Sequence, residues 1–122
     1  MCKILISIKP QFADLILSGE KKFEFRKNLP QRDVESLVIY ASAPISRVIG
    51  EVEGIDTFSC SPATLWRKTY KNAGISKGFF DKYFQGKEVA NAYVLGKIKK
   101  FKKTKSLIEY NVKMAPQSYI YL

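Results

Sequence analysis

Histidine is absent from this 122-residue sequence, and its absence removes much of the usual chemistry of hydrolytic enzymes. Histidine is the most common general base at neutral pH, so neither a Ser-His-Asp nor a Cys-His mechanism can be built here. The two cysteines, Cys2 and Cys60, are far apart and do not have the spacing of metal ligands. We therefore expect no metal, no other cofactor, and two free thiols in a reducing compartment.

Long apolar runs are also missing. No stretch approaches the roughly 18 apolar residues that a membrane-spanning helix needs. The N-terminal residues have a brief apolar run without a cleavage-type site, which is typical of a first strand and not of a signal peptide. We expect a cytoplasmic protein without membrane contact, folded as a single domain over residues 1–122. A chain of this length can form a core without disulfides or metal.

Acidic residues are scarce relative to basic ones. The chain has 21 Lys and Arg against 11 Asp and Glu, a formal net charge of +10. Such an excess favours polyanionic partners, with nucleic acid ahead of anionic membrane. The densest basic segment places six lysines in nine positions: Lys97, Lys99, Lys100, Lys102, Lys103 and Lys105. On a strand these lysines can contact the phosphates of a nucleic-acid backbone. Alternatively, they protect an edge strand from pairing with another chain.

Apolar periodicity and turn residues predict the order of elements. Strands are expected at 3–8, 21–27, 36–41, 47–58, 89–101, 107–112 and 119–122, and helices at 10–18, 61–73 and 76–84. Gly50 and Gly54, inside one of these strands, are typical of bulges or barrel corners. The pattern is α+β, with an antiparallel, curved sheet that forms a small, partly open barrel.

The most informative segment follows the first helix and reads Gly-Glu-Lys-Lys-Phe-Glu-Phe-Arg over residues 19–26. Because side chains alternate along a strand, Lys22, Glu24 and Arg26 share one face, beside a turn that carries Lys21. A carboxylate accepts hydrogen bonds while ammonium and guanidinium groups donate them, so the cluster suits a polar, planar ligand. The alternatives are a solvent-facing edge strand, or a Glu24–Arg26 ion pair that holds the barrel rim.

The Gly-x-Lys-x-x-Glu-x-Arg signature on Gly19, Lys21, Glu24 and Arg26 resembles the ASCH domain of the PUA-like superfamily. Residues 36–56 and the ending from Pro116 to Tyr119 also resemble this family. The resemblance implies a small β-barrel with two or three flanking helices and a cleft beside the first helix. It also implies binding of RNA, or action on RNA or nucleosides, in roles linked to transcription or translation.

One family member is a small amidohydrolase that acts on acetylated cytidine, and this chain departs from it. The chain resembles that enzyme at Lys21, but Glu24 stands where the enzyme has a threonine. The enzyme's catalytic glutamate aligns near Ala73 and Gly74, where this chain has no carboxylate. Its activity is therefore not carried over. Other relatives are reported as ribonucleases, so a metal-independent ribonuclease stays open.

The sequence thus predicts a ligand-binding cleft, and six residues are assigned to it: Lys21, Glu24, Arg26, Tyr40, Ser42 and Arg47. If the cleft is catalytic, Lys21, Glu24 and Tyr40 are the candidates. We expect RNA, single-stranded or modified, or a nucleotide-like ligand, and binding in preference to catalysis. An RNA-processing enzyme using the same cleft, either a metal-independent ribonuclease or a hydrolase of modified nucleosides (a nucleoside amidohydrolase), is the first alternative. A protein-interaction module, whose basic strand meets an acidic partner in transcription or translation, is the second.

Overall fold

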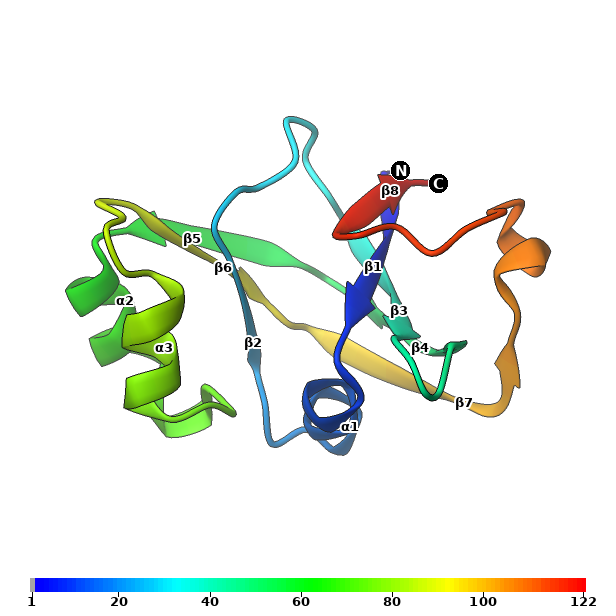
Figure 1. Ribbon diagram of the computed structural model, residues 1–122, viewed down its shortest axis with the longest axis horizontal. Coiled ribbons are helices and arrows are strands. Elements are labelled where there is room, and N and C mark those ends of the chain that lie inside the picture. The colour runs from blue at the N-terminus through cyan, green and yellow to red at the C-terminus, as the bar shows by residue number, and fades with distance from the viewer. Residues whose placement is uncertain (1) are drawn as a thin grey trace.

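The computed structural model describes residues 2–122, which form eight strands, three α-helices and two 3-10 helices (Figure 1). The strands are β1 (Lys3–Ile8), β2 (Phe23–Arg26), β3 (Ser36–Ala41), β4 (Arg47–Glu53), β5 (Asp56–Cys60), β6 (Ala90–Val94), β7 (Lys97–Lys105) and β8 (Tyr119–Tyr121). The helices are α1 (Pro10–Ser18), α2 (Pro62–Thr69) and α3 (Lys77–Tyr83), with 3-10 helices η1 (Tyr70–Asn72) and η2 (Leu107–Tyr110).

The strands form two sheets. The larger has the order β7-β4-β3-β1-β8 and the smaller the order β2-β6-β5. β3 lies at the centre of the larger sheet and all six of its residues are buried. The sheets do not close on one another, so the fold is a partly open barrel of the α+β class, as predicted. One pair departs from the antiparallel expectation: β1 and β3 are parallel, because α1 and β2 form the crossover between them.

The predicted helix ends are confirmed where local signals set them. α1 begins at Pro10 and ends before Gly19, whose φ of 86° is the left-handed conformation that glycine adopts readily. Ser61 and Ser76 cap α2 and α3 by accepting from the N–H of Thr64 and Phe79. The helix expected over 61–73 is shorter than predicted, because its last turn is η1. Figure 1 shows α2 and α3 together at one end, beside the smaller sheet.

Two expected long strands are each divided between the sheets. The strand expected at 47–58 becomes β4 and β5, with a turn at Gly54 (φ 68°), and 89–101 becomes β6 and β7, with a break at Gly96. A Cβ at Gly96 would collide with the carbonyl oxygens of Glu53 and Gly54. The two glycines therefore let the chain segments cross closely where they pass between sheets. Gly50 lies beside shifts of register on both sides of β4, as expected of a bulge.

The prediction of a strand at 107–112 is wrong, because Leu107–Tyr110 form η2 and the turn at Asn111 follows it. Ser106 and Glu109 form a reciprocal capping box, and Asn111 ends the turn with a φ of 59°. η2 packs Leu107 and Tyr110 over one face of the larger sheet, near Leu5 and Val38. The local capping interactions determine this turn more strongly than the apolar pattern does.

Separate apolar clusters support the two halves of the fold. Ile4, Ile6 and Ile8 share one face of β1, as predicted, and pack with α1. The second cluster joins the smaller sheet to α2 and α3 through residues that include Phe25 and Phe80. None of the helices in residues 2–122 has the length and apolar character required to span a membrane.

Candidate functional site

A cavity of about 560 Å³ opens between the two halves of the fold. Its walls come from the end of β1, from α1, β2, the β3–β4 turn and α3, and from the segment that precedes β8. This volume lies in the range of small-molecule sites, which are typically about 300–1,000 Å³. The elements that meet here are far apart in sequence, so the cavity is a product of the tertiary fold.

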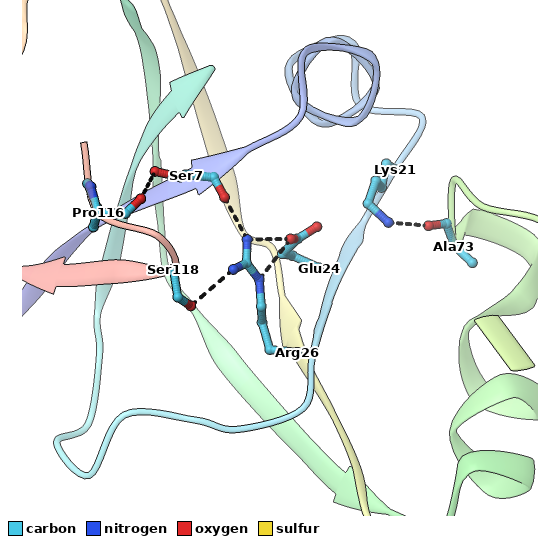
Figure 2. A network of polar contacts seen from close by, with 7 residues as sticks. All are labelled: Ser7, Lys21, Glu24, Arg26, Ala73, Pro116 and Ser118. Atoms are coloured by element: carbon cyan, nitrogen blue, oxygen red, sulfur yellow. Dashed lines mark hydrogen bonds and ion pairs between the residues drawn. The ribbon is translucent and has the colours of Figure 1, made fainter. Parts of the chain in front are cut away.

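Lys21 is buried at the cavity wall, with a relative exposure of 2%. Its Nζ donates a hydrogen bond of 2.6 Å to the carbonyl oxygen of Ala73 (Figure 2). The same Nζ lies 4.8 Å from the ring centroid of Phe25 and 5.7 Å from that of Phe12. Burial lowers the pKa of Lys21, a shift that the Glu24 carboxylate opposes and the Arg26 guanidinium reinforces.

Gly74 makes room for this lysine. A Cβ at Gly74 would lie 2.6 Å from Cγ of Lys21 and 2.7 Å from its Cβ. Gly74 also has a φ of 68°, which side-chain-bearing residues rarely adopt. Both the space and the backbone conformation therefore require glycine, and both fix the course of the Lys21 side chain.

Arg26 orients the carboxylate of Glu24. Its Nη2 and Nε donate to the same oxygen, Oε2, at 2.9 Å and 3.1 Å. Nη2 also donates to the carbonyl oxygen of Ser7 at 2.9 Å, and Nη1 to Oγ of Ser118 at 3.3 Å. Glu24 is 7% exposed and lines the cavity, and its second oxygen points away from Arg26 (Figure 2). Within residues 2–122, Oε1 receives no side-chain or backbone hydrogen bond, so it can accept from a ligand.

The structure brings five of the six predicted cleft residues to this cavity: Lys21, Glu24, Arg26, Tyr40 and Ser42. The burial of Lys21 and Glu24 excludes the solvent-facing alternative, whereas the Glu24–Arg26 ion pair is present. That pair lies inside the cavity wall, so the pair and a ligand site are compatible. Ligand binding by these residues stays a prediction.

Arg47 does not reach the cavity, and its assignment to the cleft is corrected. Its guanidinium donates to Thr104, from Nε to Oγ1 at 3.0 Å and from Nη2 to the carbonyl oxygen at 2.9 Å. Arg47 begins β4, which pairs with β7, and its side chain is held at the β7 edge of the sheet. The neighbouring Ser46 lines the cavity instead.

Several cavity residues were missed from the sequence because they come from distant segments. α3 contributes Phe79 and Tyr83, and Phe79 packs edge-on against Phe12 of α1 at 5.5 Å between ring centroids. Their i,i+4 spacing placed them on one face of a helix, which is equally typical of core packing. Burial raises the pKa of Tyr83. From the C-terminal segment comes Gln117, whose only sequence signal was the family-like ending from Pro116 to Tyr119.

The six lysines of β7 lie away from this cavity, on an edge strand of the larger sheet. All are exposed except Lys105, which is half-buried with its Nζ 4.6 Å from the ring centroid of Phe101. None of the ion pairs found within residues 2–122 includes them. Their location fits both expectations, phosphate contact and protection of an edge. Among the side chains of residues 2–122, no three His, Cys, Asp or Glu lie close enough together to form a metal-binding group.

Known proteins resemble this chain in sequence and in structure. The family model for the ASCH domain matches residues 6–105. A protein named ASCH domain-containing ribonuclease from Zymomonas mobilis is 35% identical over 92 residues, which are 75% of this chain and 62% of that protein. Large ribosomal subunit protein uL22 of Ureaplasma parvum is 34% identical over 122 residues, 98% of this chain. The chain spans only 39% of that ribosomal protein.

Solved structures agree with this relationship over nearly the whole chain. The crystal structure of ASCH from Zymomonas mobilis superposes with a TM-score of 0.87 at 31% identity, covering 98% of this chain and 87% of that one. A tyrosine-to-phenylalanine variant of the Zymomonas mobilis protein gives a TM-score of 0.84 at 31% identity, covering 98% and 89%. The signature after α1, the family match and these structures lead to one conclusion: the chain belongs to the ASCH domain family.

Proposed function

We propose that this protein binds single-stranded RNA and holds one nucleotide in the cavity around Lys21 and Glu24. One observation carries the proposal: a buried cation and a buried carboxylate line the same cavity, and the carboxylate keeps one oxygen free. Burying such groups is costly unless they are paired or used. Arg26 and Ala73 hold them in place and leave hydrogen-bonding capacity facing the cavity.

A nucleobase edge complements these groups. Carboxylates accept from the exocyclic amine of cytosine, and lysine donates to base carbonyls or to phosphate. The rings of Phe12, Phe79 and Tyr83 line the same cavity and supply faces against which a base can stack. A base turned out of a single strand therefore finds polar partners at Lys21 and Glu24 and apolar partners on α1 and α3.

The rest of the molecule supplies attraction that does not depend on sequence. The net charge of +10 and the exposed lysines of β7 favour a polyanion. Membership of the ASCH family, and a relative named as a ribonuclease, support RNA as that polyanion. The setting we propose is the cytoplasm, in a role linked to transcription or translation.

A second candidate function is metal-independent RNA cleavage at the same cavity. Two observations favour it, the lowered pKa of Lys21 and the relative named as a ribonuclease. In this reaction the Glu24 carboxylate, or Lys21 after it has released a proton, takes the proton of a 2′-hydroxyl. The 2′-oxygen forms a bond to phosphorus, and the 5′-oxygen leaves with a proton donated by a neighbouring group such as the Tyr40 hydroxyl. Deacylation of a modified nucleoside is not proposed, because the backbone of Ala73 contacts Lys21 without supplying a carboxylate.

Fluorescence anisotropy with short single-stranded and structured RNAs, at several salt concentrations, tests the proposal. Lys21→Met and Glu24→Gln keep much of the side-chain volume and remove the charge. Lys87→Ala, an exposed lysine outside the cavity, is the control. We expect both cavity variants to weaken binding of single strands about tenfold or more, with Lys87→Ala close to wild type. Binding unchanged in both cavity variants would exclude the cavity as the RNA site.

The same samples distinguish binding from cleavage. Intact RNA on a gel after incubation supports a binding protein. Fragments that form with wild type, and not with Lys21→Met, establish the ribonuclease. Fragments that form equally with both proteins identify a contaminating nuclease. Absence of RNA binding even at low salt would leave an acidic protein as the partner of the basic strand.

A further inference from the structure

A second cavity, of about 610 Å³, adjoins the first and takes no part in the site described above. η2 and the residues after it form most of its wall, including Leu107, Ile108, Asn111 and Lys113. No Asp or Glu is among its lining residues. Its chemistry is therefore apolar and hydrogen-bonding, with a single cation at the edge.

Two separate stretches of chain line both cavities. Ser46, in the β3–β4 turn, contributes to each of them. In the second stretch, residues 111–113 line the second cavity and residues 115–117 the first. Figure 1 shows this segment running from η2, near the end of β7, back to β8 beside β1. Ser46 is therefore a lining residue common to both cavities, and the segment 111–117 passes from one to the other; we call this region the groove.

The groove has the scale of consecutive nucleotides. Lys113 and Ala115 are two residues apart, so their Cα atoms are separated by at most about 7 Å. The lining segments of the two cavities thus approach each other within a distance comparable with one phosphodiester linkage. Lys113 and Ser46 both line the second cavity, and Ser46 also lines the first, so an ammonium and a hydroxyl are available to a phosphate that links the two nucleotides.

The second cavity also offers what a base requires. Ile108 is 78% exposed, and with Leu107 it gives an aliphatic surface that the face of a base can cover. Asn111 carries both an amide donor and an amide acceptor, and its side chain is exposed. Asn111 keeps a φ of 59° at the end of η2, so the amide is presented from a fixed turn.

From this continuity we propose that the second cavity binds the nucleotide adjacent to the one held by Lys21 and Glu24. The proposal rests on the proposed function of the first cavity and adds a minimum ligand of two nucleotides. Ile108 contacts the base, Asn111 its polar edge, and Lys113 the linking phosphate.

The test compares a mononucleotide with dinucleotides and trinucleotides of RNA, using titrations followed by two-dimensional NMR of the backbone amides. Signals of Phe79 and Tyr83 report on the first cavity, and those of Ile108 and Lys113 report on the second. We expect a mononucleotide to shift only the first set, and a dinucleotide to shift both and bind about tenfold more tightly.

The variant Asn111→Gly/Lys113→Ala removes the amide and the ammonium group that the proposal assigns to the adjacent nucleotide. Glycine suits the positive φ at position 111, so the turn is retained. A second variant, Ile108→Ser, changes only an exposed side chain. Both should abolish the dinucleotide advantage while mononucleotide affinity stays within about twofold, and Lys87→Ala should preserve the advantage.

The possible failures are distinguishable. The assignment of the second cavity is overturned if a dinucleotide binds no more tightly than a mononucleotide and shifts only the signals of Phe79 and Tyr83. That result leaves the proposed function intact. An advantage that persists in both variants also overturns the assignment of the second cavity. If no RNA shifts the signals of Phe79 and Tyr83, the proposed function fails, and the assignment of a neighbouring nucleotide fails with it.

Discussion

The protein uses lysine in two contrasting ways. Lys21 is 2% exposed and is fixed by a carbonyl oxygen, two aromatic rings and a glycine that makes room for it. The lysines of β7 extend from an edge strand into solvent, and none of them takes part in an ion pair with another residue of 2–122. On the proposed function, the first environment would select a ligand by geometry and desolvation, whereas the second would attract any polyanion and be screened by salt. Changes to the two regions should therefore separate selectivity from general affinity.

Removal of Arg26 should give the largest effect on stability. Arg26→Ala leaves the Glu24 carboxylate buried without its partner and also releases the bonds to Ser7 and Ser118. We expect a loss of about 3 kcal/mol in the free energy of unfolding, measured by urea denaturation. Arg26→Ala/Glu24→Gln should recover part of this loss, because the unpaired charge is removed. A loss below about 1 kcal/mol in the single variant would show that the pair lies in a wetter environment than the structure indicates.

Gly74→Ala should have the next largest effect, through the buried lysine and through backbone strain. The new Cβ would collide with Lys21 and would also occupy a backbone position with a φ of 68°. Gly86→Ala is a matched control, because Gly86 has a φ of 78° and no atom within 4 Å of the added Cβ. We expect destabilisation of about 2 kcal/mol for Gly74→Ala and about 1 kcal/mol for Gly86→Ala, with weaker RNA binding in the former alone. Equal losses would show that the Lys21 side chain moves aside freely.

The buried lysine should also make stability depend on pH at alkaline values. Burial lowers the pKa of Lys21 in the folded state below its unfolded value, so the unfolded chain binds more protons between the two pKa values. The contribution of this group to stability therefore rises as pH increases through the folded pKa toward about 10.5. Burial also raises the pKa values of the half-buried Tyr83 and the buried Tyr93, and these shifts act in the opposite direction above about pH 10.

Subtracting a Lys21→Met curve isolates the lysine from those tyrosines. Urea unfolding of both proteins between about pH 8 and pH 10 should show that the free energy of unfolding of wild type rises relative to that of the variant as pH increases. The methionine replaces a buried cation by an apolar chain, so the variant should be at least as stable as wild type at neutral pH. A constant difference across this range would mean that Lys21 is solvated as an ordinary lysine.

The contrast between the two regions also explains what the sequence could predict. Pro10 and Gly19 determined both ends of α1 locally, and the signature placed Lys21, Glu24 and Arg26 side by side within one turn and strand. Tyr83 and Gln117 come from segments that only the tertiary fold brings to the cavity. Arg47 was misplaced because nothing in the sequence indicated that β7 would pair with β4 and hold its side chain through Thr104. The parallel pairing of β1 with β3 is non-local in the same way.

The smallest effect on stability, and the clearest effect on salt dependence, should come from β7. Lys99→Ala/Lys100→Ala/Lys102→Ala changes three exposed side chains, so the free energy of unfolding should change by less than about 0.5 kcal/mol. If these lysines contact phosphates, the slope of log affinity against log salt should fall by about 2 units for single-stranded RNA. Lys71→Ala/Lys82→Ala/Lys87→Ala removes the same charge from exposed positions outside β7 and should change the slope less.

An equal reduction of the salt slope in both triple variants would attribute the effect to net charge. An unchanged slope, together with self-association of the β7 triple variant in light scattering, would instead identify the lysines as protection of the β7 edge. Selectivity for single strands should survive in either case, because the proposed function assigns it to the cavity with Lys21 and Glu24.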